Sequence, residues 1–92
     1  MAADLGLLQR RRLGLTVANV AAKVRELEKA GALTGIVAVD AAAVAQALLN
    51  ENPELYQKEA GRDWQEFFDA LISFLEKLIP LILKLIEIFG GV

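Results

Sequence analysis

The sequence predicts an all-α protein: two or three short helices, then one long, strongly amphipathic C-terminal helix over about residues 63–89. Apolar residues recur at intervals of three and four, which is the spacing of one helix face. The chain has 92 residues, enough for one domain, and 55% of them are hydrophobic. We expect the long helix to pack in an oligomer or in a larger assembly.

The first fifteen residues carry three consecutive arginines between Gly6 and Gly14. This composition predicts a mobile basic arm over residues 1–15. The leucines before the arginines do not form the continuous apolar core of a secretory signal peptide. We therefore expect no signal peptide, and a cytoplasmic location or a place in an assembled particle. A membrane-peripheral location is the alternative.

Residues 16–30 are predicted to form the first helix, because Thr16 is a favourable N-cap and apolar residues follow at helical spacing. Residues 33–39 contain β-branched residues, but a lone strand has nothing in the chain to pair with. The pattern therefore predicts an extended linker there. Asp40 is a favourable N-cap for a second helix over about residues 40–50.

Pro53 indicates a third short helix over about residues 53–60, because proline is favoured at the first helical position. Gly61 provides a stop for this helix. The segment from 16 to 60 is thus expected to form a cap of short helices. The segment 61–92 is expected to form the assembly helix, all within one domain.

The last helix is predicted to begin at Asp63, which has Glu66 three residues later in a capping-box pattern. On a helical wheel, its polar residues fall within an arc of about 120°. The opposite arc, roughly 220–240° wide, is apolar. Pro80 lies in the polar arc, where a carbonyl without its N–H partner can be hydrated, so we expect a bend rather than a break.

The apolar arc is wider than one neighbouring helix can cover. A helix over residues 63–89 is about 40 Å long, whereas a spherical domain of this size is roughly 32 Å across. Part of the arc should therefore contact another molecule. The residues expected at this interface are Trp64, Phe67, Phe68, Leu71, Phe74, Leu75, Leu78, Ile82, Leu85, Ile86 and Phe89.

The amino-acid composition excludes many classes of protein function. The chain contains no cysteine and no histidine, so disulfides, thiolate nucleophiles and the usual proton shuttle are excluded. The carboxylates Glu66, Asp69 and Glu76 share one convex helix face, which predicts a solvated surface rather than a catalytic site. We expect no catalytic residue, no metal site, no cofactor and no small-molecule substrate.

The partner is expected to be a second copy or a larger protein assembly such as a virion or shell. A net charge of −2 argues against nucleic acid. Arg10, Arg11 and Arg12 are candidate contacts for a phosphate or an acidic partner. The longest uncharged runs in the last helix are six residues, 70–75 and 78–83, too short for a membrane span. The sequence thus predicts a non-enzymatic structural or interaction protein, with a membrane-peripheral or membrane-active amphipathic-helix protein as the alternative.

Overall fold

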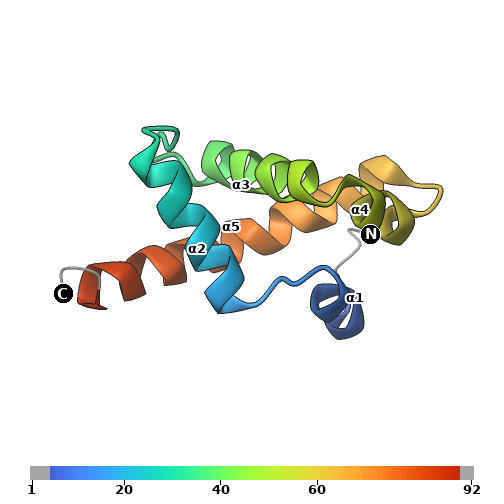
Figure 1. The fold of residues 1–92 in the computed structure, drawn as a ribbon, viewed down its shortest axis with the longest axis horizontal. Helices are drawn as coiled ribbons and strands as arrows, with labels where there is room; N and C mark the ends of the chain where they lie inside the picture. The colour runs from blue at the N-terminus through green and yellow to red at the C-terminus, as the bar shows by residue number, and fades with distance from the viewer. Residues whose placement is uncertain (1–4, 90–92) are drawn as a thin grey trace.

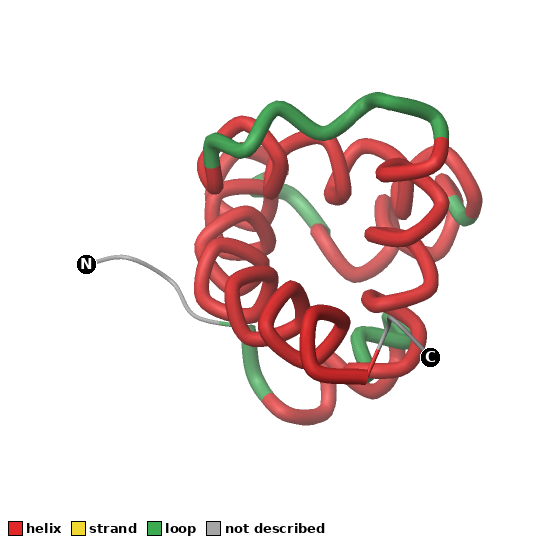
Figure 2. The backbone as a smooth tube through the Cα atoms, turned by 90° about the vertical axis from the view of Figure 1, so that its left-hand side faces the viewer, coloured by secondary structure: helices red, strands yellow, loops and turns green. Residues whose placement is uncertain are grey.

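Every regular element in residues 5–89, the range described by the computed structural model, is an α-helix (Figures 1 and 2). The all-α class predicted from the spacing of apolar residues is therefore confirmed. Short loops connect the helices, as Figure 2 shows. The five helices of this range are α1 (Leu7–Arg12), α2 (Val17–Lys29), α3 (Val37–Glu51), α4 (Pro53–Ala60) and α5 (Trp64–Phe89).

Helix α5 sets the length of the molecule. Its 26 residues, at about 1.5 Å each, give a rod of about 39 Å, and the molecule measures 42 × 25 × 22 Å. Helices α2, α3 and α4 all contact α5. Figure 1 shows α3 lying along α5, α2 crossing it, and the C-terminal end of α5 extending beyond α2. The long C-terminal helix predicted over about 63–89 is thus confirmed.

The core lies between α5 and the two helices packed on one side of it. Helices α3 and α5 make the most extensive contact of any pair, and alanines on the contact face of α3 allow the two backbones to approach closely. Removing these apolar side chains from water is the main force that holds the helices together. The buried residues of α2, α3 and α5 include Val20, Val24, Ala41, Val44, Ala45, Leu48, Phe67, Leu71, Leu75, Ile79 and Ile82.

The predicted starts of three helices agree with the structure, two of them through a capping hydrogen bond. The side chain of Thr16 accepts a hydrogen bond from the backbone N–H of Asn19 over 3.1 Å, so Thr16 caps α2. Pro53 is the first residue of α4. The Oδ1 atom of Asp63 accepts a hydrogen bond from the backbone N–H of Glu66 over 3.0 Å, which satisfies one free donor at the start of α5.

Residues 5–15, part of the segment predicted to form a mobile arm, pack against the core in the structure, and residues 1–4 lie outside the described range. Helix α1 occupies the middle of this segment. The three arginines and two glycines suggested exposure to solvent, but leucines on both sides of the basic cluster reach the core. Their burial offsets the entropy lost when the segment becomes ordered. The buried leucines are Leu5, Leu13 and Leu15.

Hydrogen bonds also join this N-terminal segment to the rest of the molecule. The hydroxyl of Tyr56 donates to the backbone carbonyl of Leu13 over 3.3 Å, and burial raises the pKa of Tyr56 to about 12. The amide Nδ2 of Asn19 donates to the carbonyl of Gly14 over 2.9 Å. Gly14 has a φ of 69°, which an L-residue with a side chain rarely adopts. The turn between α1 and α2 thus depends on this glycine.

Residues 33–39, predicted to form a linker, instead include the start of α3 at Val37. Asp40 lies in the first turn of α3, so its predicted role as the N-cap is wrong. Its carboxylate accepts hydrogen bonds from the N–H and hydroxyl of Thr34, at 2.7 and 2.9 Å, and from the N–H of Gly35 at 3.0 Å. Asp40 therefore closes the preceding loop, and that closure holds the β-branched residues of the first turn in a helix that their propensity disfavours.

Helix α5 continues without interruption through Pro80, as predicted. Proline lacks the N–H group that would bond to the carbonyl of Glu76, and its ring crowds that carbonyl. Pro80 and Glu76 are both exposed, so water can replace the missing hydrogen bond. The helix can therefore tolerate this proline without a buried polar group being left unpaired.

Candidate functional site

The eleven residues predicted to form an interface fall into three groups. One group is buried within the chain itself: Phe67, Leu71, Leu75 and Ile82. A second group is half-buried against the core: Phe68, Phe74, Leu78 and Ile86. The third group remains exposed: Trp64, Leu85 and Phe89.

Two of the exposed residues belong to an apolar surface on the last turns of α5, which we call the terminal strip and define as Leu81, Leu85, Ile88 and Phe89. Their exposed fractions are 60%, 43%, 62% and 64%. Large apolar side chains scattered singly over a surface are ordinary, but a contiguous group is typical of a contact site. The interface prediction missed Leu81 and Ile88, although both lie on the apolar arc of the helical wheel.

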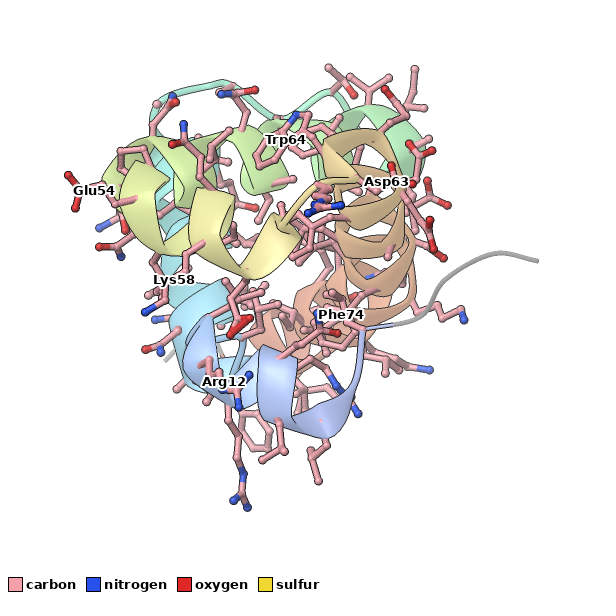
Figure 3. The ribbon with its side chains drawn as sticks, turned by 90° about the vertical axis from the view of Figure 1, so that its right-hand side faces the viewer. Arg12, Glu54, Lys58, Asp63, Trp64 and Phe74 are labelled. Atoms are coloured by element: carbon pink, nitrogen blue, oxygen red, sulfur yellow. The ribbon has the colours of Figure 1, made fainter. Side chains whose placement is uncertain are left out.

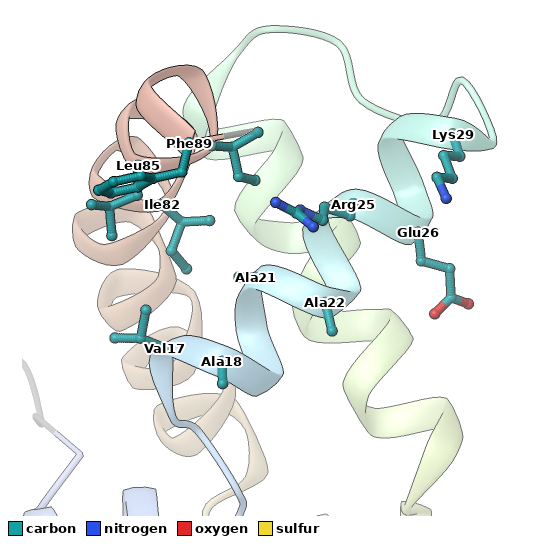
Figure 4. A pocket seen from close by; sticks show the side chains of 11 residues that line it. Val17, Ala18, Ala21, Ala22, Arg25, Glu26, Lys29, Ile82, Leu85 and Phe89 are labelled. Atoms are coloured by element: carbon teal, nitrogen blue, oxygen red, sulfur yellow. The ribbon is translucent and has the colours of Figure 1, made fainter. Parts of the chain in front are cut away.

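A groove of about 560 Å³ borders the terminal strip, between α2 and the C-terminal part of α5 (Figure 4). Its walls are mainly apolar, with Val17, Ala18 and Ala21 from α2 facing Ile82 and Leu85 from α5. Three charged residues of α2 also line the groove, Arg25, Glu26 and Lys29, and Figure 4 shows the guanidinium of Arg25 extending toward α5. The groove and the strip form one continuous apolar surface.

The same side of α5 is covered further upstream by the N-terminal segment. Leu5 and Arg10 line a cavity of about 380 Å³ together with Phe74, Leu78 and Leu81. The guanidinium of Arg10 lies 5.4 Å from the centre of the Phe74 ring, a distance suited to a cation–π contact. Helix α1 therefore protects the part of this side near Phe74, and the terminal strip begins where that protection ends.

The three arginines proposed to contact a phosphate or an acidic partner have different surroundings. Arg10 is half-buried and packs on Phe74. The Nη1 atom of Arg12 lies 3.4 Å from Oε1 of Glu59, so this arginine pairs with an acid of its own chain. Arg11 is exposed. Figure 3 shows Arg12 on α1. The structure does not bring the three side chains together to form one binding site.

Trp64 lies at the other end of α5 from the terminal strip (Figure 3). Its ring stacks on Phe68 with a centroid distance of 5.7 Å and also contacts Phe67 at 5.9 Å. About 38% of Trp64 remains exposed. Both ring contacts are with neighbours on its own helix, and the exposed part of Trp64 lies apart from the terminal strip.

The acidic face of α5 has the solvated character expected of it. Glu66, Asp69 and Glu76 are exposed, and Asp63 raises the pKa of Glu66 through a hydrogen bond and the proximity of its charge. Glu66 lines an open cavity of about 210 Å³ together with Glu59 and Asp63, and its side chain stays exposed to solvent. Within residues 5–89, no group of acidic side chains gathers in an arrangement that could hold a metal ion.

One buried cation has a structural explanation. Lys23 is only 6% exposed, and its ammonium bonds to Glu26 over 3.0 Å and also to Glu51. These contacts join α2 to the end of α3 and compensate for the desolvation of the charge. Lys23 is therefore part of the helix packing, and its charge is unavailable to a ligand.

In the part of the chain that the structure describes, no helix combines the length and apolar character needed to cross a bilayer. Searches against protein-family models, curated proteins and solved structures find no match to this chain.

Proposed function

We propose that this chain is a non-enzymatic interaction protein that assembles with another protein chain through the terminal strip. The observation that supports the proposal is the exposure of four large apolar side chains in one group at the end of α5. The partner is either a second copy or a subunit of a larger complex. Histidine, the commonest general acid or base, and cysteine, a frequent nucleophile, are missing from the sequence.

Burial of the strip would supply enough free energy to stabilise a contact with a partner. Complete burial of a leucine, isoleucine or phenylalanine side chain contributes about 1.5–3 kcal/mol. Four such side chains that are about half exposed leave roughly 3–6 kcal/mol for a partner to gain. That energy amounts to a large part of the stability of a small domain, so an uncovered strip would be a substantial unused driving force.

Photo-crosslinking from the strip tests the proposal. A photoreactive phenylalanine analogue at position 85, in cells that produce the chain, should give an adduct with a protein. The mass of the adduct distinguishes a second copy, at 10.0 kDa, from a different chain. The same analogue at Lys58, an exposed residue of α4 at the other end of the molecule (Figure 3), is the matched control and should give none.

Two outcomes would contradict the proposal. Equal yields at positions 85 and 58 would mean that the strip has no preferred partner. Adducts with lipid alone would favour the membrane-peripheral alternative, in which the strip lies in the interface of a bilayer. The acidic residues beside the apolar face of α5 support a protein partner over lipid, because membrane-surface helices usually carry basic polar faces.

A further inference from the structure

The residues of the terminal strip follow one line along α5. Leu81, Leu85 and Ile88 are separated by four and three residues, so they lie one above the other on the helix surface. Upstream, the same line passes through Phe74 and Leu78, beside the N-terminal segment that holds Leu5 and Arg10. The strip is therefore the uncovered continuation of a helix contact that already exists within the chain.

The exposed area suits one side of a two-chain interface. Val17, at the mouth of the groove, is 51% exposed and extends the strip. Taking about 180 Å² for each fully exposed large apolar residue, the strip and Val17 present roughly 500 Å² of apolar surface. A standard interface takes about 800 Å² from each partner, of which about 56–65% is apolar. The strip with its polar rim thus has the size that a stable dimer needs.

The charged residues beside the strip can pair with the same residues of a second copy of the chain. Lys84 and Glu87 each precede a strip residue, so both lie along the same edge of it, and both are exposed. Within residues 5–89 neither takes part in an ion pair. When two identical helices pack antiparallel, this edge of one lies beside the same edge of the other. A two-fold axis near Leu85 then sets Lys84 of each copy next to Glu87 of the other.

We infer that a second copy of this chain covers the terminal strip, with the two α5 helices antiparallel and with reciprocal Lys84–Glu87 pairs at the rim. The inference rests on the proposed function and identifies the partner. Each copy buries its strip against that of the other, and the two ion pairs fix the direction and register of the helices.

Charge reversal tests this arrangement, with light scattering and sedimentation over a range of concentrations. The wild-type chain should form a dimer of twice 10.0 kDa. Lys84→Glu and Glu87→Lys each turn two attractive contacts into repulsive ones, and should each weaken the dimer by about three- to tenfold. The double variant K84E/E87K restores opposite charges and should return the dissociation constant to within about twofold of wild type.

Matched controls use the same charge changes elsewhere. Lys58→Glu and Glu54→Lys lie on α4 at the other end of the molecule (Figure 3), where both residues are exposed, and should leave the dimer unchanged. The effects at positions 84 and 87 should shrink at about 1 M salt, where the Debye length is about 3 Å. All four sites are on the surface, so circular dichroism should show the same helix content in every variant.

The outcomes separate this inference from the proposed function. A wild-type chain that stays monomeric overturns the pairing, while a protein adduct at position 85 would still support the strip as a contact site. A dimer that Leu85→Asp dissolves but that charge reversal does not change overturns the antiparallel register alone. A dimer that Leu85→Asp leaves intact overturns both proposals.

Discussion

Asp40 is a buried carboxylate whose charge is held by the loop before α3. Burial alone would raise the pKa of Asp40, but three hydrogen bonds from Thr34 and Gly35 outweigh that effect and lower it. An ionised carboxylate that accepts several backbone hydrogen bonds is well stabilised. Asp40 therefore fixes the path of the chain between α2 and α3 and, through it, the position of both helices on α5.

Replacing Asp40 with asparagine should show the strength of this arrangement. The amide removes the charge and puts an N–H group where donors already point, so Asp40→Asn should lower the free energy of unfolding by about 1.5–3 kcal/mol. Urea unfolding followed by circular dichroism measures the difference. Asp69→Asn is the matched control, because Asp69 is exposed and accepts only a surface hydrogen bond from Gln65. An equal loss in both variants would contradict the special role of Asp40.

The same carboxylate gives the protein a defined response to acid. Because folding lowers the pKa of Asp40, its stabilisation is complete above the ordinary carboxyl pKa of 3.8 and is lost as the pH falls below it. The difference in free energy of unfolding between wild type and D40N should therefore shrink as the pH is lowered from about 5 to about 2. A difference that stays constant over this range would mean that the charge of Asp40 does not contribute.

At the scale of the elements, periodicity predicts α2 and α5 because both are long enough to repeat their apolar pattern. The same reasoning fails for α1, which is only 6 residues long. A helix this short is unstable alone, and it forms here because Leu5, Leu13 and Leu15 are buried by other elements. It also fails at the start of α3, where Asp40 acts on the loop behind it, a contact that residue spacing does not reveal.

Substitution of Pro80 measures how much the low helix preference of proline reduces the stability of α5. Pro80→Ala restores the hydrogen bond to the carbonyl of Glu76, and should raise the free energy of unfolding by about 1–3 kcal/mol in thermal or urea unfolding. Pro53→Ala is the matched control, because Pro53 is the first residue of α4, where proline is favourable, and should give no gain. A loss of stability in P80A would show that the packing of α5 depends on a bend at the proline.

At the scale of the whole molecule, the sequence predicts that some of the apolar arc stays uncovered but not which part. The width of the arc follows from the helical wheel, whereas its coverage depends on where the other helices dock. Here α3 and α2 cover one side near Leu71 and Leu75, and the N-terminal segment reaches Phe74. The segment thought to be a free arm is thus one of the elements that decide where the exposed surface begins.

Folding and assembly should therefore depend on different residues of the same helix. Leu71 is 0% exposed, so Leu71→Ala should lower the free energy of unfolding by about 2–5 kcal/mol. Leu85→Ala removes a side chain that is 43% exposed and should lower it by less than about 1 kcal/mol, when unfolding is measured at a concentration too low for association. At higher concentration L85A should lose more stability than it does as a monomer, because binding stabilises the folded chain by mass action and L85A weakens that binding. Light scattering beside the unfolding curves separates the two effects. Equal losses of monomer stability in the two variants would mean that Leu85 belongs to the core, and the terminal strip would then have to be defined without it.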